Sequence, residues 1–266
     1  MPVARAPGAD LHFELSGRGP RLLFVNGSGV TLADSRPLIE AFASRFDVLA
    51  YDHRGLGGSS EVTRSYAMAD CAADAAEVMD AAGWTSAPVV GISFGGMVAL
   101  ELAVSRPERI ERLALLCTSA GGGGGSSYPL HELEDLDPLD KSTVRRTLMD
   151  SRFDAAWLAA HPDDQALVVM MEARAPGPDH PRLTGLREQL EARRTHDTWD
   201  RLATIDCPTF IGCGVYDGIA PWRNSEAMAS RIEGAELHVY RGGHAFLAQD
   251  GRAFDDVVGF LQARSS

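Results

Sequence analysis

The clearest candidate for chemistry in this sequence is a serine among glycines, Ser93 in the segment Gly91–Gly96, which fits the pattern G-x-S-x-G. An apolar run typical of a buried strand precedes this serine, and a helical pattern follows it. A serine on such a strand-to-helix turn adopts a strained backbone conformation that exposes its hydroxyl above the sheet. The flanking residues must be small, because the strand and helix backbones nearly touch there. The pattern predicts a nucleophile. The alternative is a glycine-rich turn of a nucleotide-binding fold, but neither G-x-G-x-x-G nor a P-loop pattern fits here.

A serine hydroxyl needs a base to take its proton, and the base needs a carboxylate to orient it. Of the eight histidines, His244 stands on a glycine-flanked loop after the last strand-like segment, and Asp217 follows the strand-like segment 209–212. The carboxyl ends of parallel strands form one rim, so we expect Ser93, Asp217 and His244 to meet there. The order serine, aspartate, histidine is the one expected of a hydrolase with this kind of sheet. His53, at the end of another predicted strand, is a second candidate for the base.

Acyl transfer also requires hydrogen-bond donors for the oxyanion that forms on the attacked carbonyl. The residue after the nucleophile, Phe94, can supply one backbone N–H, and a helix that begins there favours negative charge at the same point. We expect the second donor to be the backbone N–H of Ser28, in the segment Asn26–Gly29. The alternative for that segment is a turn without a catalytic role.

The elements that must position these residues follow an α/β pattern. Residues 2–6 and 11–15 predict a hairpin, and short apolar runs then alternate with helical segments. Runs that are apolar throughout indicate a mostly parallel sheet with helices on both faces. The predicted strands are 21–25, 46–51, 88–92, 113–117, 209–212 and 236–240, and the predicted helices are 37–46, 70–82, 94–105, 221–231 and 254–261.

The alternation breaks in the middle of the chain. Residues 121–125 are five consecutive glycines, and the segment up to residue 203 contains helical patterns without a strand-like run. We therefore expect one core domain, formed by residues 1–120 and 204–266, and a helical cap insertion formed by residues 121–203. The expected helices of the cap are 141–149, 154–160, 164–174 and 183–194.

The cap should select the substrate, and three of its features allow two interpretations each. The glycine run is either a hinge or a loose loop. His196 and Asp197 either reach the catalytic cleft or end a solvated helix. A set of apolar residues either lines the cleft or forms the cap's own core: Trp157, Leu167, Val168, Met170 and Met171.

Composition limits the classes of partner. The 266 residues carry a formal net charge of −12, which argues against nucleic acid or an anionic membrane surface, because both require a basic face. No window contains the roughly 20 apolar residues of a membrane span, and the first residues lack the apolar region of a secretory signal. The four cysteines form no C-x-x-C pair, which favours buried, reduced thiols. We therefore expect a soluble cytoplasmic protein whose partner is a small molecule.

These segments together resemble the α/β-hydrolase superfamily over residues 22–261. The resemblance rests on Asn26–Gly29, Asp52–Ser59, Gly91–Gly96, Val215–Gly218 and Gly243-His244. The chain is most similar to bacterial 3-oxoadipate enol-lactonase-like hydrolases and small carboxylesterases. In that superfamily the segment at Asp52–Ser59 supports the fold near the active-site rim, and a helical cap follows the sixth central strand. Asn26 is a departure, because many relatives have a histidine there.

The resemblance implies a serine hydrolase that needs no metal or cofactor and cleaves a carboxylic ester or lactone through an acyl-enzyme on Ser93. Asp217 and His244 would complete the triad. The same triad could instead serve C–C bond hydrolysis, perhydrolysis of the haloperoxidase type, or acyl transfer. A ligand-binding receptor on a hydrolase scaffold is a further alternative from another class of protein.

Overall fold

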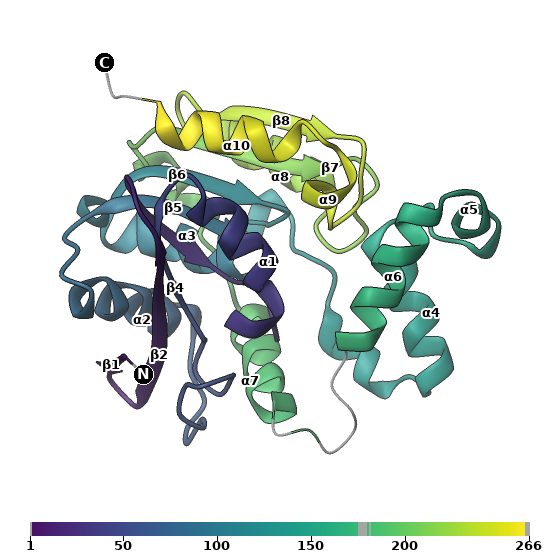
Figure 1. Cartoon of the computed structure of the whole chain (residues 1–266), viewed down its shortest axis with the longest axis horizontal. Coiled ribbons are helices and arrows are strands. Elements are labelled where there is room, and N and C mark those ends of the chain that lie inside the picture. The colour runs from purple at the N-terminus through teal and green to yellow at the C-terminus, as the bar shows by residue number, and fades with distance from the viewer. Residues whose placement is uncertain (1, 175–179, 181, 264–266) are drawn as a thin grey trace.

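A single sheet of eight strands forms the centre of the chain in the computed structural model, which describes residues 2–174, 180 and 182–263 (Figure 1). The strand order is β1-β2-β4-β3-β5-β6-β7-β8. The pairs β1·β2 and β2·β4 are antiparallel, and the strands from β4 across to β8 are parallel. The predicted α/β class with a mostly parallel sheet is therefore confirmed. The strands are β1 (Val3–Ala6), β2 (Ala9–Gly17), β3 (Arg21–Val25), β4 (Asp47–Tyr51), β5 (Ala87–Ile92), β6 (Ile110–Leu116), β7 (Thr209–Gly214) and β8 (Glu236–Tyr240).

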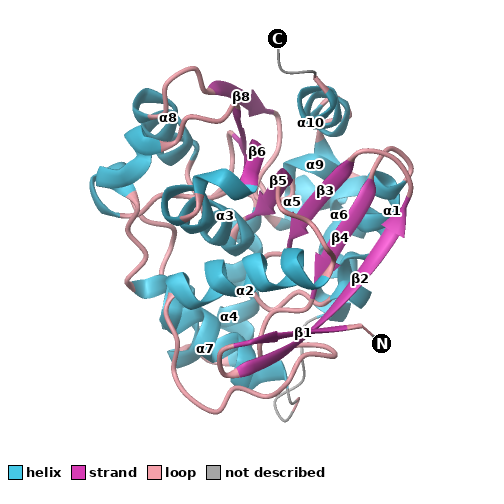
Figure 2. Cartoon of the chain, turned by 90° about the vertical axis from the view of Figure 1, so that its left-hand side faces the viewer, coloured by secondary structure: helices cyan, strands magenta, loops and turns pink. Residues whose placement is uncertain are grey.

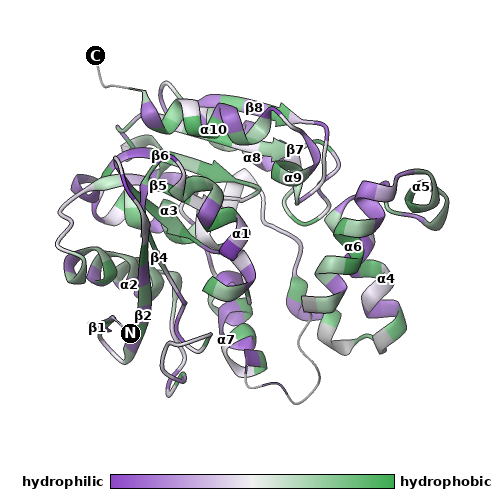
Figure 3. Ribbon diagram, in the orientation of Figure 1, coloured by the Kyte–Doolittle hydropathy of each residue, from purple (hydrophilic) through white to green (hydrophobic). Residues whose placement is uncertain are grey.

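Helices cover both faces of the sheet, so the central strands are buried on each side (Figure 2). Helices α2, α3 and α8 pack into one apolar cluster, whereas α1, α9 and α10 pack into a second cluster on the opposite face. Figure 3 shows the central strands as mostly apolar, in agreement with the continuous apolar runs of the sequence. These helices are α1 (Leu32–Ala43), α2 (Met68–Ala81), α3 (Phe94–Ser105), α8 (Trp222–Arg231), α9 (Phe246–Gln249) and α10 (Ala253–Gln262).

The register of the strands brings the loops that follow them to one rim of the sheet. Ile92, the last residue of β5, pairs with Leu116, which ends β6, and Leu116 in turn pairs with Gly212 in β7. Because these strands are parallel and end at nearly the same level, the turns after them lie next to one another. The rim positions three of the loops that the sequence singled out for chemistry.

Two details of the helices differ from the sequence-based expectation. Helix α1 begins at Leu32 rather than at Pro37, because Thr31 and Asp34 form a capping box at its first turn. Pro37 lies inside the helix, which ends at Ala43 instead of residue 46. The four-residue helix α9, directly after the loop that carries His244, was not expected.

The segment between β6 and β7 contains the helices α4, α5, α6 and α7, with no strand among its described residues. In Figure 1 the helices α4, α5 and α6 form a lobe beside the sheet, and α7 lies closer to α1. The bounds are α4 (Pro138–Met149), α5 (Ala155–Ala160), α6 (Pro162–Arg174) and α7 (Arg182–Arg194), and the 3-10 helices are Gly122–Gly124, Leu130–Asp135 and Trp199–Thr204. The division into a core and a cap remains our prediction.

The glycine run is a closely packed turn. Residues Gly122–Gly124 form a short 3-10 helix against Trp199. A Cβ atom on Gly123 or Gly124 would lie 2.6 or 2.5 Å from the Trp199 ring, closer than side chains can approach. The glycines therefore allow the chain to pass against the indole, which argues against the interpretation as a loose loop.

Candidate active site

Ser93 occupies a strained turn between β5 and α3. Its φ of 54° and ψ of −115° lie outside the regions that residues with a side chain normally adopt. The packing explains the glycines: a Cβ on Gly91 would lie 2.4 Å from the carbonyl oxygen of Gly95. Thr118, at the end of β6, donates its hydroxyl to the carbonyl oxygen of Ser93 at 2.7 Å and so holds the turn from the neighbouring strand. The local sequence thus produces the predicted turn, with the half-buried Ser93 lining a cleft.

The structure brings Ser93, Asp217 and His244 together. Nε2 of His244 lies 2.9 Å from Oγ of Ser93, and Nδ1 lies 2.8 Å from Oδ2 of Asp217. The other carboxylate oxygen accepts the backbone N–H groups of Ile219 and Ala220, both at 2.8 Å. With its carboxylate fixed, Asp217 takes the Nδ1–H hydrogen bond and leaves Nε2 free to accept the hydroxyl proton of Ser93. This arrangement can activate the serine as a nucleophile.

The two candidate oxyanion donors lie next to this serine. Phe94 is the first residue of α3, so its N–H belongs to the positive end of a helix. The loop Asn26–Gly29 follows β3, which pairs with β5, and an atom at the Cβ position of Gly27 would lie 3.7 Å from Cβ of Ser93. Ser28 lines the same cleft as Ser93 and His244. The segments that carry both candidate donors therefore lie beside Ser93, and their role as oxyanion donors remains our prediction.

The loop Asn26–Gly29 is held by helix α7, which the sequence did not reveal. Oε1 of the buried Gln189 accepts the N–H of Gly29 at 2.7 Å. Arg182 donates to the carbonyl oxygen of Gly29 at 3.1 Å and forms an ion pair with Asp34 at 2.7 Å. These contacts join residues about 150 positions apart, so no local sequence signal could have identified them.

His53, the second candidate for the base, has a structural position instead. It is buried, and its Nε2 donates to the backbone carbonyl of Asn26 at 3.0 Å. Burial lowers the pKa of His53 to about 4, so the imidazole is neutral at pH 7. The ring packs edge-on against Phe94, with the centroids 5.2 Å apart. His53 thus supports the two segments that carry the candidate oxyanion donors.

The segment Asp52–Ser59 holds the core together near the rim, as the resemblance implies. The carboxylate of Asp52 accepts the N–H of Leu32, at the start of α1, and the N–H of Gly58. The next charged residue, Arg54, forms a buried two-point ion pair with Asp74 of α2. Both carboxylates thus fix neighbouring segments of the fold to one another.

The cleft above Ser93 has a volume of about 770 Å³ and mostly apolar walls. Of the five apolar cap residues singled out in the sequence, Leu167, Met170 and Met171 of α6 line this cleft. Trp157 and Val168 pack with Phe153 and Leu158 in a small core, and Leu167 contacts this core as well as the cleft. Both interpretations of the set therefore apply, and Leu167 belongs to both groups. Methionine side chains adapt to varied ligand shapes, so this wall can accommodate more than one apolar group.

The end of helix α4 is tied directly to the loops that carry Asp217 and His244. The carbonyl of Met149 accepts the backbone N–H of His244 at 2.6 Å, and that of Leu148 accepts the N–H of Gly218 at 2.9 Å. On the far side of the base loop, Oε1 of Gln249 accepts the N–H of Gly243 at 2.8 Å. The helical segment thus contributes to the geometry of the triad as well as to the cleft.

The prediction of a solvated helix end holds for Asp197 but not for His196. His196 is buried, with 7% of its surface exposed, but it is not part of the wall of the Ser93 cleft. Asp197 is exposed, and its carboxylate accepts the backbone N–H of Trp199. The expectation of a solvated histidine was wrong because the loop after β6 covers this position, and no pattern within the helix itself indicates that cover.

Comparison with known proteins assigns the family. The family model described as alpha/beta hydrolase fold matches residues 20–250. The chain belongs to the α/β-hydrolase family. A protein of Azorhizobium caulinodans named "Putative carbamate hydrolase RutD" is 30% identical over 97% of each chain. The crystal structure of a hydrolase from Pseudomonas aeruginosa is 31% identical with a TM-score of 0.78, over 98% of this chain and 97% of the other.

A third member supports the predicted resemblance within this family. The enol-lactonase from Burkholderia xenovorans is 25% identical, with a TM-score of 0.81, and the alignment covers 98% of this chain and all of the lactonase. Family and relatives together support the assignment as a hydrolase. Within the described residues, none of the helices combines the length and the apolar character needed to cross a bilayer.

Proposed function

We propose that this protein hydrolyses a carboxylic ester or lactone of a small molecule through an acyl-enzyme on Ser93. The observation that carries the proposal is the chain of two hydrogen bonds from Ser93 Oγ through His244 to Asp217, at 2.9 and 2.8 Å. A serine has ordinary reactivity unless a neutral imidazole can accept its proton, and this geometry provides that acceptor.

In the proposed mechanism, Ser93 attacks the carbonyl carbon while His244 takes the hydroxyl proton. The resulting oxyanion lies between the backbone N–H groups of Ser28 and Phe94, each of which can stabilise the transition state by about 3–4 kcal/mol. His244 then gives its proton to the leaving alkoxide, and the C–O bond breaks to leave the acyl-enzyme. Water, deprotonated by His244, attacks the acyl group and releases the carboxylic acid and the free serine. Asp217 stabilises the imidazolium in both halves of the reaction.

We assign the substrate specificity to the segment 121–203, which we propose acts as a cap. Helix α6 supplies a flexible apolar wall, and α4 adds one charged group, Arg145. Among the described residues no carboxylate pairs with Arg145, whereas Arg182 in the same cleft is paired with Asp34. A substrate that carries a carboxylate besides its ester or lactone bond would satisfy this guanidinium. A neutral substrate would leave it without a counter-charge.

A carbamate is a second candidate substrate, because the relative from Azorhizobium is named for that activity and aligns with almost the whole chain. Serine attack on a carbamate carbonyl uses the same residues. A panel of neutral esters, lactones with and without a carboxylate, and carbamates separates the candidates. Peroxide and short alcohols, added as competing acceptors, separate hydrolysis from perhydrolysis and acyl transfer.

The decisive experiment is the substitution Ser93→Ala. We expect loss of p-nitrophenyl acetate hydrolysis and of labelling by a fluorophosphonate probe, with a Tm close to that of the unmodified protein. The control is Ser230→Ala, which removes an exposed hydroxyl from α8 and should leave both signals unchanged. Retention of hydrolysis in Ser93→Ala would refute the mechanism. A chain that hydrolyses no ester and resists the probe would instead be a binding protein on this scaffold.

A further inference from the structure

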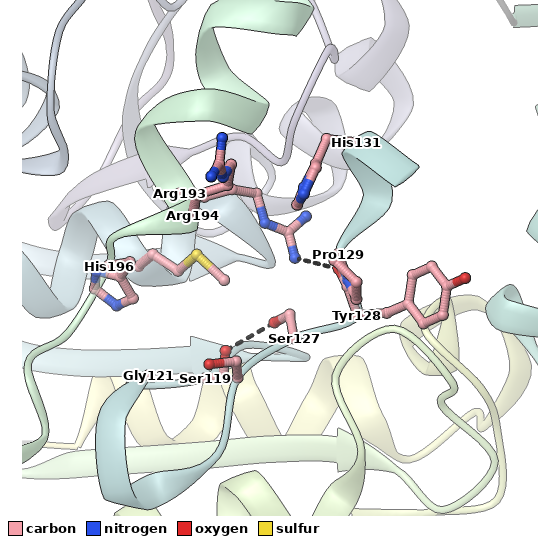
Figure 4. Close-up of a pocket in the computed structure, with 11 residues that line it drawn as sticks. Ser119, Gly121, Ser127, Tyr128, Pro129, His131, Arg193, Arg194 and His196 are labelled. Carbon is pink, nitrogen blue, oxygen red and sulfur yellow. Dashed lines mark hydrogen bonds between the residues drawn. The ribbon is translucent and has the colours of Figure 1, made fainter. Parts of the chain in front are cut away.

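A second cavity, of about 160 Å³, lies where the C-terminal end of α7 meets the loop after β6 (Figure 4). It shares no lining residue with the Ser93 cleft. Figure 4 shows arginine and histidine side chains on one side of this cavity and Ser119 and Ser127 on the opposite side. The lining residues are Met97, Ser119, Gly121, Ser126, Ser127, Tyr128, Pro129, His131, Arg193, Arg194 and His196. We call this space the α7 cavity.

Arg193 places a charged guanidinium in the wall of the α7 cavity. Its guanidinium donates to the backbone carbonyl of Tyr128 at 3.1 Å, and within residues 2–174, 180 and 182–263 no carboxylate forms an ion pair with it. Burial lowers the pKa of Arg193 to about 10, so the group is still charged at neutral pH. Its neighbour Arg194 differs, because it is exposed and pairs with Glu191. A partly desolvated guanidinium with one neutral acceptor still has unused donors.

The remaining polar groups of the wall are donors or can become donors. Among the described residues, neither ring nitrogen of the buried His196 has a hydrogen-bond partner within the usual distance and angle limits. Burial lowers the pKa of His196 to about 4 against the opposing effect of the nearby Ser119 backbone, so the ring is neutral and keeps one N–H. The hydroxyls of Ser119 and Ser127 lie 2.7 Å apart, and one of the two therefore has its proton available for another acceptor. None of the described lining residues is acidic.

We propose that the α7 cavity binds a small oxyanion, either a tetrahedral one such as inorganic phosphate or a short carboxylate. Among the described residues the wall has no acidic group that could hold a cation, and the small volume leaves no room for a large apolar molecule. An oxyanion accepts hydrogen bonds at several oxygens, which matches a wall with a charged guanidinium, hydroxyls and an imidazole N–H.

The place of this cavity connects it to the catalytic cleft. An anion held there would join the end of α7 to the loop that follows β6. The same helix carries Gln189 and Arg182, which hold the Gly29 end of the loop Asn26–Gly29. Anion binding would therefore restrain α7 in the position in which it supports that loop. The proposal does not depend on the identity of the substrate or on the role of Ser93.

The test is isothermal titration calorimetry, together with Tm measurements, in sodium phosphate, sulfate or acetate against chloride at equal ionic strength. We expect saturable binding of at least one of the three, with a Tm increase of about 3 °C at ten times its Kd. The three anions distinguish a tetrahedral oxyanion from a carboxylate. Binding should persist in Ser93→Ala, which separates this site from the catalytic serine.

Variants locate the site. Arg193→Gln should raise the Kd at least tenfold, whereas Arg187→Gln, the same change at an exposed position of the same helix, should leave the Kd unchanged. If Arg193→Gln does not fold, Ser127→Ala tests the opposite wall and should raise the Kd about threefold. Phosphate and sulfate also stabilise proteins by exclusion from their surfaces, but that effect does not saturate and is equal in all variants. Absence of saturable binding, or equal Kd values in the unmodified protein and the variants of the wall, would overturn the proposal.

Discussion

The substitution Gly95→Ala would test how the serine turn is fitted against the neighbouring loop. A Cβ at residue 95 would lie 2.1 Å from the carbonyl oxygen of Val25 and 2.5 Å from that of Asn26. A carbon and an oxygen that are not bonded require about 3.2 Å, so the two backbones must separate by about 1 Å. Ser28 is two residues after Asn26, and Phe94 directly precedes residue 95. The separation therefore moves the two candidate oxyanion donors apart.

Catalysis should suffer more than stability. A displacement of about 1 Å between reacting groups can lower the rate about 100-fold, whereas one extra methyl group in a packed region costs about 1–3 kcal/mol of unfolding free energy. We expect kcat/KM for p-nitrophenyl acetate, measured well below the Tm, to fall about 100-fold. The rate of fluorophosphonate labelling should fall in parallel, because the probe also develops negative charge on its oxygen.

Gly259→Ala is the matched control, because a Cβ at residue 259 of α10 would have no neighbour within 4 Å. This change should leave kcat/KM unaltered and raise the unfolding free energy by about 0.5–1 kcal/mol, as expected for alanine in place of glycine in a helix. If Gly95→Ala had a kcat/KM within twofold of the unmodified protein and an unchanged Tm, the close approach of the two backbones would have no catalytic importance.

Three further predictions concern the residues around the triad. Asp217→Asn should lower kcat about 10⁴-fold in a p-nitrophenyl ester assay, because the amide no longer selects the productive tautomer of His244; a loss below tenfold would contradict the assigned role. Gln189→Leu leaves the buried N–H of Gly29 without its acceptor. We therefore expect kcat/KM to fall about tenfold and the unfolding free energy to fall by about 1–3 kcal/mol. If α7 does not hold this loop, neither quantity should change. Below pH 6.5 the unfolded chain protonates His53, whereas the folded protein takes up this proton only near pH 4, so stability should fall as the pH falls. Urea titrations should show that, between pH 8 and pH 4.5, the free energy of unfolding falls by about 2.5 kcal/mol less in His53→Gln than in the unmodified protein. Equal pH dependence in both proteins would disprove this.

The sequence was most informative where one short segment determines its own structure. The turn at Ser93 requires small residues at fixed positions and a strand before it, so both the turn and its place on the rim could be predicted. The start of α1 was missed because Pro37 resembles a first helical residue, although the capping box of Thr31 and Asp34 was present earlier in the sequence.

Contacts between distant segments could not be predicted in this way. The sequence of α7 reads as an ordinary helix, and only the folded chain shows that Gln189 faces Gly29. His196 was misjudged for the same reason, since a histidine at a helix end is exposed unless another part of the chain covers it. The two groups of apolar residues in the cap differ only in which neighbour each meets, and this is a property of the tertiary structure.

The attachment of the end of α4 to the loops of Asp217 and His244 has a consequence for engineering and for evolution. Exchange of the whole helical segment for that of another hydrolase would replace carbonyl groups that fix the base, so such a chimera should lose activity even when it folds. The side chains of Met170 and Met171 face the cleft from α6 and are not among the groups that make these hydrogen bonds, whereas Asp164 at the start of α6 accepts a hydrogen bond from Gln249. Divergence in substrate range, natural or by directed libraries, is therefore least harmful at these two methionines.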